Sequence, residues 1–114
     1  MRDDQDALRR RPPQRIGDLL PDAARHLGLE AELRLAKAAA TWDALIAERV
    51  PPAVGATRLL RLEPGRVVVE ADEPIVASEL RMRALELLGA FAAAPGGASA
   101  AELRIVVRRD GRSP

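Results

Sequence analysis

The stretch from Thr57 to Leu80 constrains the fold more than any other part of the chain. It contains two runs rich in leucine and valine, "TRLLRLE" and "RVVVEAD", separated by Pro64-Gly65. Apolar runs of this length joined by Pro-Gly predict two strands and a tight turn. Glu73-Pro74 follows at once, and proline is favoured in the first turn of a helix. The pattern therefore predicts a hairpin whose second strand leads directly into a helix.

Period-two alternation assigns the two faces of this hairpin. We expect Leu60 and Leu62 to point inward from the first strand, with Val67, Val69 and Ala71 inward from the second. The expected outward residues are Leu59, Arg61, Arg66, Val68, Glu70 and Asp72.

Helices are predicted on both sides of the hairpin. Asp18 is a suitable N-cap for a short first helix that Gly28 ends, and a second helix runs from about Glu30 to Arg49, where Val50-Pro51-Pro52 stops it. The third helix continues from Glu73-Pro74 to about residue 94, and "ELRIVVRR" forms a last strand. The order α-α-β-β-α-β predicts an α+β two-layer sandwich, a three-stranded sheet with helices on one face.

The second helix is apolar on two sides, which is typical of a helix sandwiched between neighbours. An alanine-rich stripe is expected to face the first helix, and a second stripe of Leu35, Trp42 and Leu45 is expected to face the sheet. The alanine-rich stripe comprises Leu29, Leu33, Ala36, Ala40, Ala44 and Ala47. The predicted core residues are Trp42, Val67, Val69, Val76, Leu80, Leu87 and Phe91.

A chain of 114 residues has room for one domain. We place that domain at residues 15–109. Residues 1–14 mix aspartate and arginine before Pro12-Pro13 and have no apolar face to bury, so a flexible N-terminal arm is expected there. Residues 110–114, "DGRSP", are expected to form a flexible C-terminus.

The residue types argue against catalysis. The chain has no cysteine, its only histidine is His26, and no second imidazole or thiolate accompanies it as zinc binding requires. "APGGASA" at residues 94–100 lacks the GK[ST] of a phosphate loop and joins a helix to a strand, the wrong context for one. We therefore expect no enzyme activity, no cofactor, no metal and no small-molecule substrate.

The first fifteen residues contain no apolar stretch typical of a signal peptide, and no run approaches the roughly 20 apolar residues of a membrane span. We therefore expect a protein of the cytoplasm, the nucleoid included, with no membrane partner. All basic residues except Lys37 are arginine, whose forked donors suit phosphates and carboxylates.

Two surfaces could bind a partner. On the outward sheet face, an apolar patch of Leu59, Val68 and Val106 is surrounded by Arg61, Arg66, Arg104 and Arg108, with Arg109 beyond them. This face could bind a nucleic-acid backbone or an acidic partner. The alternative is an amphipathic sheet that merely faces water. On the third helix, Ile75, Met82 and Leu85 lie off the core stripe and could form a small docking ridge. They could equally pack beside the second helix.

The order of several segments resembles the DciA family of bacterial replicative-helicase loaders. The segments are "RIGDLLPDAARHLGL", "WDALIAERV", "RVVVEADEPIVASELRMRALELLGAF" and the final basic strand, and together they cover residues 15 to 109. The most specific pieces are Trp42 with Ile46, and Ala77, Glu79 and Leu80 followed by Arg81.

The resemblance implies a KH-like domain that contacts the DnaB-type replicative helicase and assists its loading on single-stranded DNA without using ATP. The chain departs from the family pattern in several places. Ala47 stands where glycine is usual, Ala53 and Ala56 replace a histidine and a proline, and Val76 replaces an aromatic residue. A KH-type GxxG clamp is also missing. Two functions therefore stay open: a helicase-binding adaptor, or a KH-like nucleic-acid-binding module that acts independently of the helicase.

Overall fold

The structure is a computed structural model that describes the backbone of residues 13–108 and the side chains of residues 22–108. The elements in chain order are α2 (Pro13–Arg49), η1 (Pro51–Ala53), β1 (Thr57–Glu63), β2 (Arg66–Ala71), α3 (Pro74–Met82), α4 (Ala84–Ala93) and β3 (Glu102–Val107). Contacts within the chain divide it into two compact units, Met1–Leu33 and Arg34–Pro114. The expected domain limits of 15–109 stay a prediction.

The two predicted N-terminal helices are wrong as separate elements, because α2 is one continuous helix through Gly28. Gly28 does not adopt the positive φ that a C-terminal cap requires. A glycine inside a helix costs only about 1 kcal/mol relative to alanine, and the surrounding leucines, alanines, glutamates and arginines are strong helix formers. Residues 13 and 14, expected in the arm, begin α2; the rest of the expected arm and of the C-terminus lies outside the described residues.

Within the Met1–Leu33 unit, every side chain from Asp22 to Leu33 is exposed. Leu27 is 64% exposed, Leu29 54% and Leu33 64%. The alanine-rich stripe was expected to contact a first helix, and that expectation is wrong: Ala36, Ala40, Ala44 and Ala47 are all exposed as well. The physical reason is the continuity of α2, which leaves no separate helix to fold back on the stripe.

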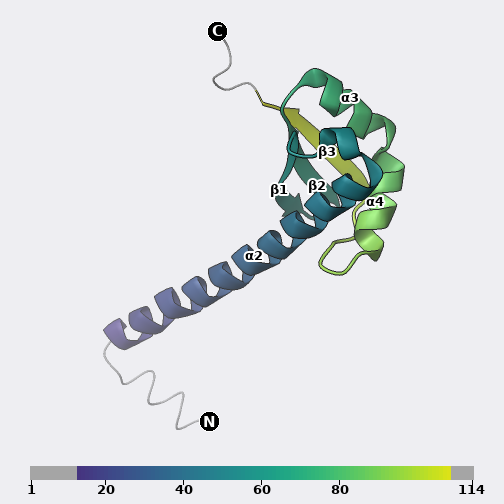
Figure 1. Cartoon of the computed structure of the whole chain (residues 1–114). Coiled ribbons are helices and arrows are strands. Elements are labelled where there is room, and N and C mark those ends of the chain that lie inside the picture. The colour runs from purple at the N-terminus through teal and green to yellow at the C-terminus, as the bar shows by residue number, and fades with distance from the viewer. Residues whose placement is uncertain (1–12, 109–114) are drawn as a thin grey trace. The chain divides into compact units, whose positions relative to one another are not determined.

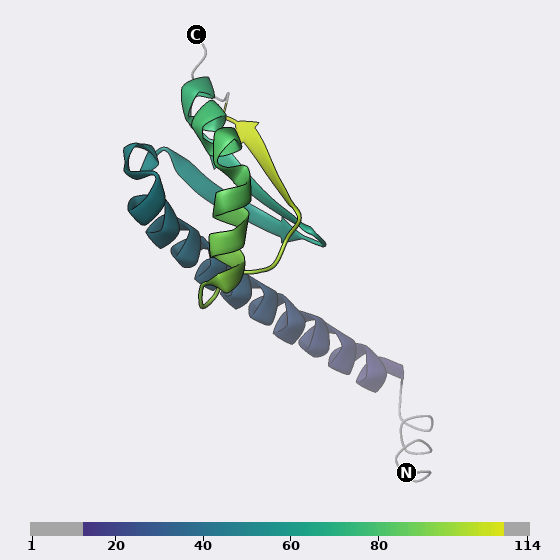
Figure 2. The same ribbon diagram turned by 90° about the vertical axis from the view of Figure 1, so that its right-hand side faces the viewer.

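The Arg34–Pro114 unit is an α+β sandwich, so the predicted fold class is confirmed. Its sheet has the order β1-β2-β3, with β1 antiparallel and β3 parallel to the central strand β2. Figures 1 and 2 show α3 and α4 over one face of this sheet. The parallel strand is reached by the crossover through these two helices, as parallel pairing requires.

A β-bulge changes the predicted faces of β1. Leu59 pairs with Val69, whereas Arg61 pairs with Val68, so that Leu60 is the extra residue. Leu59 is therefore 6% exposed and part of the core, while Leu60 is half-buried outside it. The alternation had predicted the reverse, because a bulge shifts the period-two pattern by one residue.

The core lies between the sheet and the helices of the Arg34–Pro114 unit. Trp42 from α2 and Phe91 from α4 are its two aromatic residues, and their rings meet edge to face with centroids 6.1 Å apart. Trp42 also donates from Nε1 to Thr57 Oγ1 on β1 at 3.4 Å. Six of the seven predicted core residues are at most 1% exposed, and Val76 is half-buried against them; the six are Trp42, Val67, Val69, Leu80, Leu87 and Phe91.

The third predicted helix is divided into α3 and α4 at Arg83, which has φ −108° and ψ 17°. Its N–H still donates to the Leu80 carbonyl at 3.1 Å. After α4, Gly96 takes a positive φ of 85° beside Thr41, whose hydroxyl donates to the Pro95 carbonyl at 2.8 Å. This bond fixes the loop that leads back to β3.

Candidate interaction surfaces

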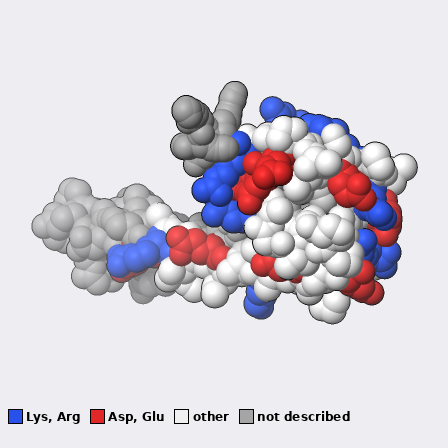
Figure 3. All heavy atoms as spheres, turned by 45° about the horizontal axis from the view of Figure 1, so that its top comes forward, with Lys and Arg blue, Asp and Glu red and all other residues white. Residues whose placement is uncertain are grey.

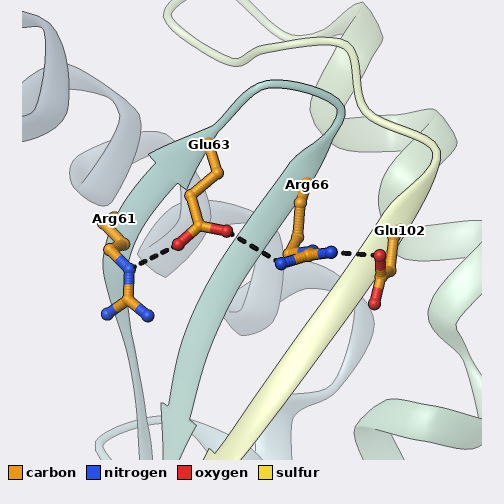
Figure 4. A network of polar contacts seen from close by, with 4 residues as sticks. All are labelled: Arg61, Glu63, Arg66 and Glu102. Atoms are coloured by element: carbon orange, nitrogen blue, oxygen red, sulfur yellow. Dashed lines mark hydrogen bonds and ion pairs between the residues drawn. The ribbon is translucent and has the colours of Figure 1, made fainter.

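The outward face of the sheet carries arginines and carboxylates in alternation. Within β1 and β2, Arg61 donates to Glu63 at 2.7 Å and Arg66 donates to the other oxygen of the same carboxylate at 3.0 Å. Arg66 also donates to Glu102 on β3 at 3.0 Å. Figure 4 shows these four side chains as one chain of ion pairs across three strands. We call them the ladder: Arg61, Glu63, Arg66 and Glu102.

The sheet register explains why the ladder forms. Glu63 pairs with Arg66 across the hairpin, and Arg66 pairs with Glu102 across the parallel strands. The three side chains therefore form one row on one face of the sheet, where opposite charges on neighbouring strands attract. Sequence reasoning identified the arginines but missed the two glutamates, because their proximity depends on this register.

The ladder shifts the pKa values of its members. Bonding to the Arg61 guanidinium, with Arg66 as the second donor, holds the pKa of Glu63 below its ordinary value of 4.5. The Glu102 carboxylate, followed by Glu63, raises the pKa of Arg66. Both shifts favour the charged forms, so at neutral pH these arginines are already bound to anions.

Two further arginines on this face have carboxylate partners. Arg58 lies 3.2 Å from Glu70, and Arg108 lies 3.6 Å from Asp72. Together with the ladder and Arg104, the face holds five arginines and four carboxylates, a net charge of about +1 at neutral pH. The predicted arginine-rich patch is therefore nearly neutral overall.

Arg104 differs from the other arginines of this face. It is exposed and has no ion pair or hydrogen bond within the described part of the chain. Across the sheet, Arg104 on β3 pairs with Val68 on β2, and Val68 pairs in turn with Arg61 on β1. Val68 is fully buried although it does not belong to the core cluster. Arg109, the last residue of the predicted patch, lies outside the described residues.

The second candidate surface lies on α3 and the start of α4. We call Ile75, Met82 and Leu85 the α3 surface; they are 73%, 76% and 85% exposed. Ile75 and Met82 are seven residues apart, two turns along one side of α3. None of the three belongs to the core cluster.

Ile75 of the α3 surface also lines an apolar depression of about 360 Å³. Its lining comes from the end of α2, from η1 and from α3: Val50, Pro52, Ala53, Ile75, Val76 and Glu79. Figure 3 brings the α3 end forward and shows a broad uncharged area with acidic and basic clusters at its edges. Sequence reasoning missed this depression, because Val50-Pro51-Pro52 was interpreted only as a helix stop.

The junction of α3 and α4 is occupied by ion pairs. Arg83 lies 2.8 Å from Glu79 and 3.7 Å from Glu86, and Glu86 also binds Arg49 of α2 at 3.2 Å. The hydrogen bond to the Glu79 carboxylate is the main reason that the pKa of Arg83 is raised. A KH domain clamps nucleic acid with a GxxG loop between two helices. Here no such loop separates α3 from α4: the one residue between them is Arg83, which is already bound to carboxylates.

The described residues contain no group of three or more His, Asp or Glu side chains that could hold a metal ion. His26 is exposed on α2 and lies 3.2 Å from Glu30, one helical turn away. No buried polar or charged side chain is present in the part of the chain that the structure describes. None of the helices described there is long and apolar enough to cross a membrane.

Comparison with known proteins identifies the family. The family model described as "Dna[CI] antecedent, DciA" matches residues 15–105, which is most of the chain. No curated protein matches the chain. DciA is known as a family associated with the loading of the DnaB helicase, and it is not a known class of enzyme. The chain belongs to the DciA family.

Proposed function

We propose that this protein is a non-enzymatic adaptor that binds the DnaB-type replicative helicase through the α3 surface and assists its loading on single-stranded DNA. The observation that carries the proposal is the exposure of Ile75, Met82 and Leu85, together with the apolar depression that Ile75 lines. Large apolar side chains gathered at the surface mark sites of protein–protein contact. Membership of the DciA family supports the helicase as the partner.

The chemistry of this surface favours an apolar partner. Val50, Ala53 and Val76 supply an apolar floor, and Glu79 is the one charged residue of the lining. Glu79 is shared with Arg83 at 2.8 Å, so its charge is largely balanced within the protein. Most of the binding energy should therefore come from apolar burial, which depends little on salt.

The first test measures binding of the purified helicase to the wild type and to Met82→Glu and Leu85→Asp. Each variant should bind about tenfold more weakly, because charging an apolar anchor costs on the order of 1–2 kcal/mol at an interface. Val54→Asp is the matched control, since Val54 is also exposed, at 57%, and lies outside α3 and α4. Thermal unfolding of all three variants should match that of the wild type.

Two results would contradict the proposal in different ways. Equal helicase binding by the wild type and by Met82→Glu and Leu85→Asp excludes the α3 surface as the docking site. A folded wild-type protein that does not bind the helicase at all excludes the adaptor function.

A second candidate is a KH-like module that binds RNA or DNA independently of the helicase. Arg104 supports it, as an exposed arginine without a partner in the described residues. Arg104→Glu combined with Arg108→Glu should then abolish binding, and wild-type affinity should fall steeply between about 50 and 200 mM salt. Unchanged nucleic-acid binding in the double variant excludes this face. The ion-paired ladder and the occupied α3–α4 junction make us prefer the adaptor.

A further inference from the structure

The free edge of β3 is the least protected part of the sheet. β3 is the last strand in the order β1-β2-β3, and Figure 2 shows no described helix or strand beyond it. Its pairing with β2 runs without a break from Glu102 to Val107, whereas the opposite edge strand, β1, is interrupted by the bulge at Leu60. Sheet edges are usually blunted by bulges, prolines or cover. β3 has no bulge, and no proline lies within it.

The hydrogen bonds show which groups point to this edge. The N–H groups of Glu102 and Arg108 donate to carbonyls on the β2 side, Gly65 at 3.2 Å and Ala71 at 2.8 Å. Backbone groups of successive strand residues point to opposite sides, so Leu103, Ile105 and Val107 direct their N–H and C=O groups away from β2. Backbone N–H and C=O groups at a sheet edge need hydrogen-bond partners, and an added strand supplies a partner for every one of them.

The side chains of β3 are self-complementary in one antiparallel register. With Ile105 opposite its own copy, Leu103 lies opposite Val107, and both pairs have the outward hydrogen-bonding groups that such pairs need. On the other face, Arg104 lies opposite Val106 and Glu102 lies opposite Arg108. The registers one step to either side instead place Arg104 opposite Arg104 or opposite Arg108, and like charges directly opposite destabilise a sheet.

We propose that β3 pairs with β3 of a second copy of this chain, antiparallel and centred on Ile105, so that two three-stranded sheets join into one. About six main-chain hydrogen bonds would form, two for each of the three outward-facing pairs. Leu103 and Ile105, which are only half-buried in one copy, gain apolar neighbours across the two-fold axis. This inference is independent of the proposed helicase function.

The decisive experiment uses interchain disulfides, because the chain has no native cysteine. Arg104→Cys and Val106→Cys are prepared separately and then mixed under oxidising conditions. In the proposed register a thiol at position 104 lies opposite position 106 of the partner at about 4.5 Å between Cα atoms, close enough for a disulfide. A covalent dimer should form in the mixture and only weakly in either protein alone. No covalent dimer in the mixture, or equal amounts in all three samples, overturns the register.

Sedimentation of two matched variants tests the contact without crosslinking. Val106 is 39% exposed on the open sheet face, so Val106→Glu and Val106→Lys should both fold, which thermal unfolding verifies. Each places its charge opposite Arg104 of the partner, twice per dimer, so the dimer dissociation constant of the lysine variant should be roughly tenfold above that of the glutamate variant. Arg104→Glu added to Val106→Lys should restore dimerisation. The proposal is overturned if the wild-type protein stays monomeric at all concentrations. A monomer that binds an extended peptide at the β3 edge also overturns it.

Discussion

Removing the two glutamates of the ladder should convert a nearly neutral sheet face into a nucleic-acid-binding one. In Glu63→Gln combined with Glu102→Gln, Arg61 and Arg66 lose their carboxylate partners. Glutamine keeps the size of glutamate and can still accept a hydrogen bond, so the row of cross-strand contacts survives. The change therefore alters the charge of the face while leaving its shape intact.

The size of the effect follows from the charges on this face. The substitutions raise its net charge by two, from about +1 to about +3, at neutral pH. If both released arginines contact phosphates, the slope of log K against log salt for single-stranded DNA should become steeper by about 1.4, or 0.7 per contact. Over a fourfold rise in salt, this adds about a sevenfold loss of affinity to that of the wild type.

The assay is fluorescence anisotropy of a labelled single-stranded oligonucleotide at several salt concentrations. The matched control is Glu48→Gln with Glu73→Gln, since both carboxylates are exposed, and neither has an ion pair in the described part of the chain. This control raises the net charge of the protein equally but away from the ladder. An unchanged slope in the ladder variant, or an equal change in the control, would refute the reasoning.

Four further predictions concern the stability of the fold. Phe91→Ala should lower the free energy of unfolding by about 3–5 kcal/mol, because it empties a fully buried site against Trp42. Leu85→Ala, at a residue that is 85% exposed, should change it by less than about 0.5 kcal/mol. Trp42 fluorescence in denaturant measures both variants, and similar losses in the two would contradict the assigned core. Gly96→Ala should destabilise by roughly 1–2 kcal/mol, since φ is positive and a Cβ would lie 2.7 Å from the Thr41 hydroxyl. Gly89→Ala, in open space within α4, should stabilise by about 0.5–1 kcal/mol, and a loss there would be evidence against an exposed helical site. Finally, the pKa of Glu63 is lowered in the folded state, so the stability that its ion pairs contribute is complete above pH 4.5 and is lost as the pH falls through the folded-state pKa. The denaturation midpoint of the wild type should therefore fall more steeply in acid than that of Glu63→Gln, and parallel curves would exclude the ladder as the cause.

Local patterns predicted the hairpin, the three strands and the core of the Arg34–Pro114 unit. Proline and glycine at residues 64 and 65 defined the turn, and helical spacing correctly placed Leu80, Leu87 and Phe91 on the buried face. These features depend on residues close together in the chain, so the sequence alone suffices to identify them.

The errors arose where a local signal competed with its surroundings. Gly28 suggests a helix end, but the strong helix formers on both sides carry α2 through it. The bulge at Leu60 has no distinctive residue, so the alternation of β1 was assigned one position out of phase. The partners of Arg61 and Arg66 could not be predicted either, because Glu102 lies 36 residues from Arg66 and only the sheet register brings them together.

The position of the strand that runs parallel to β2 has a consequence for synthesis. Because this strand is the last element in the described part of the chain, a ribosome must translate past Val107 before Val67, Val68 and Val69 acquire their second neighbour. A nascent chain halted before Glu102 leaves one side of these valines without a hydrogen-bonded partner, the kind of surface that aggregates or recruits chaperones. Productive folding of this sheet is therefore delayed until β3 has been translated.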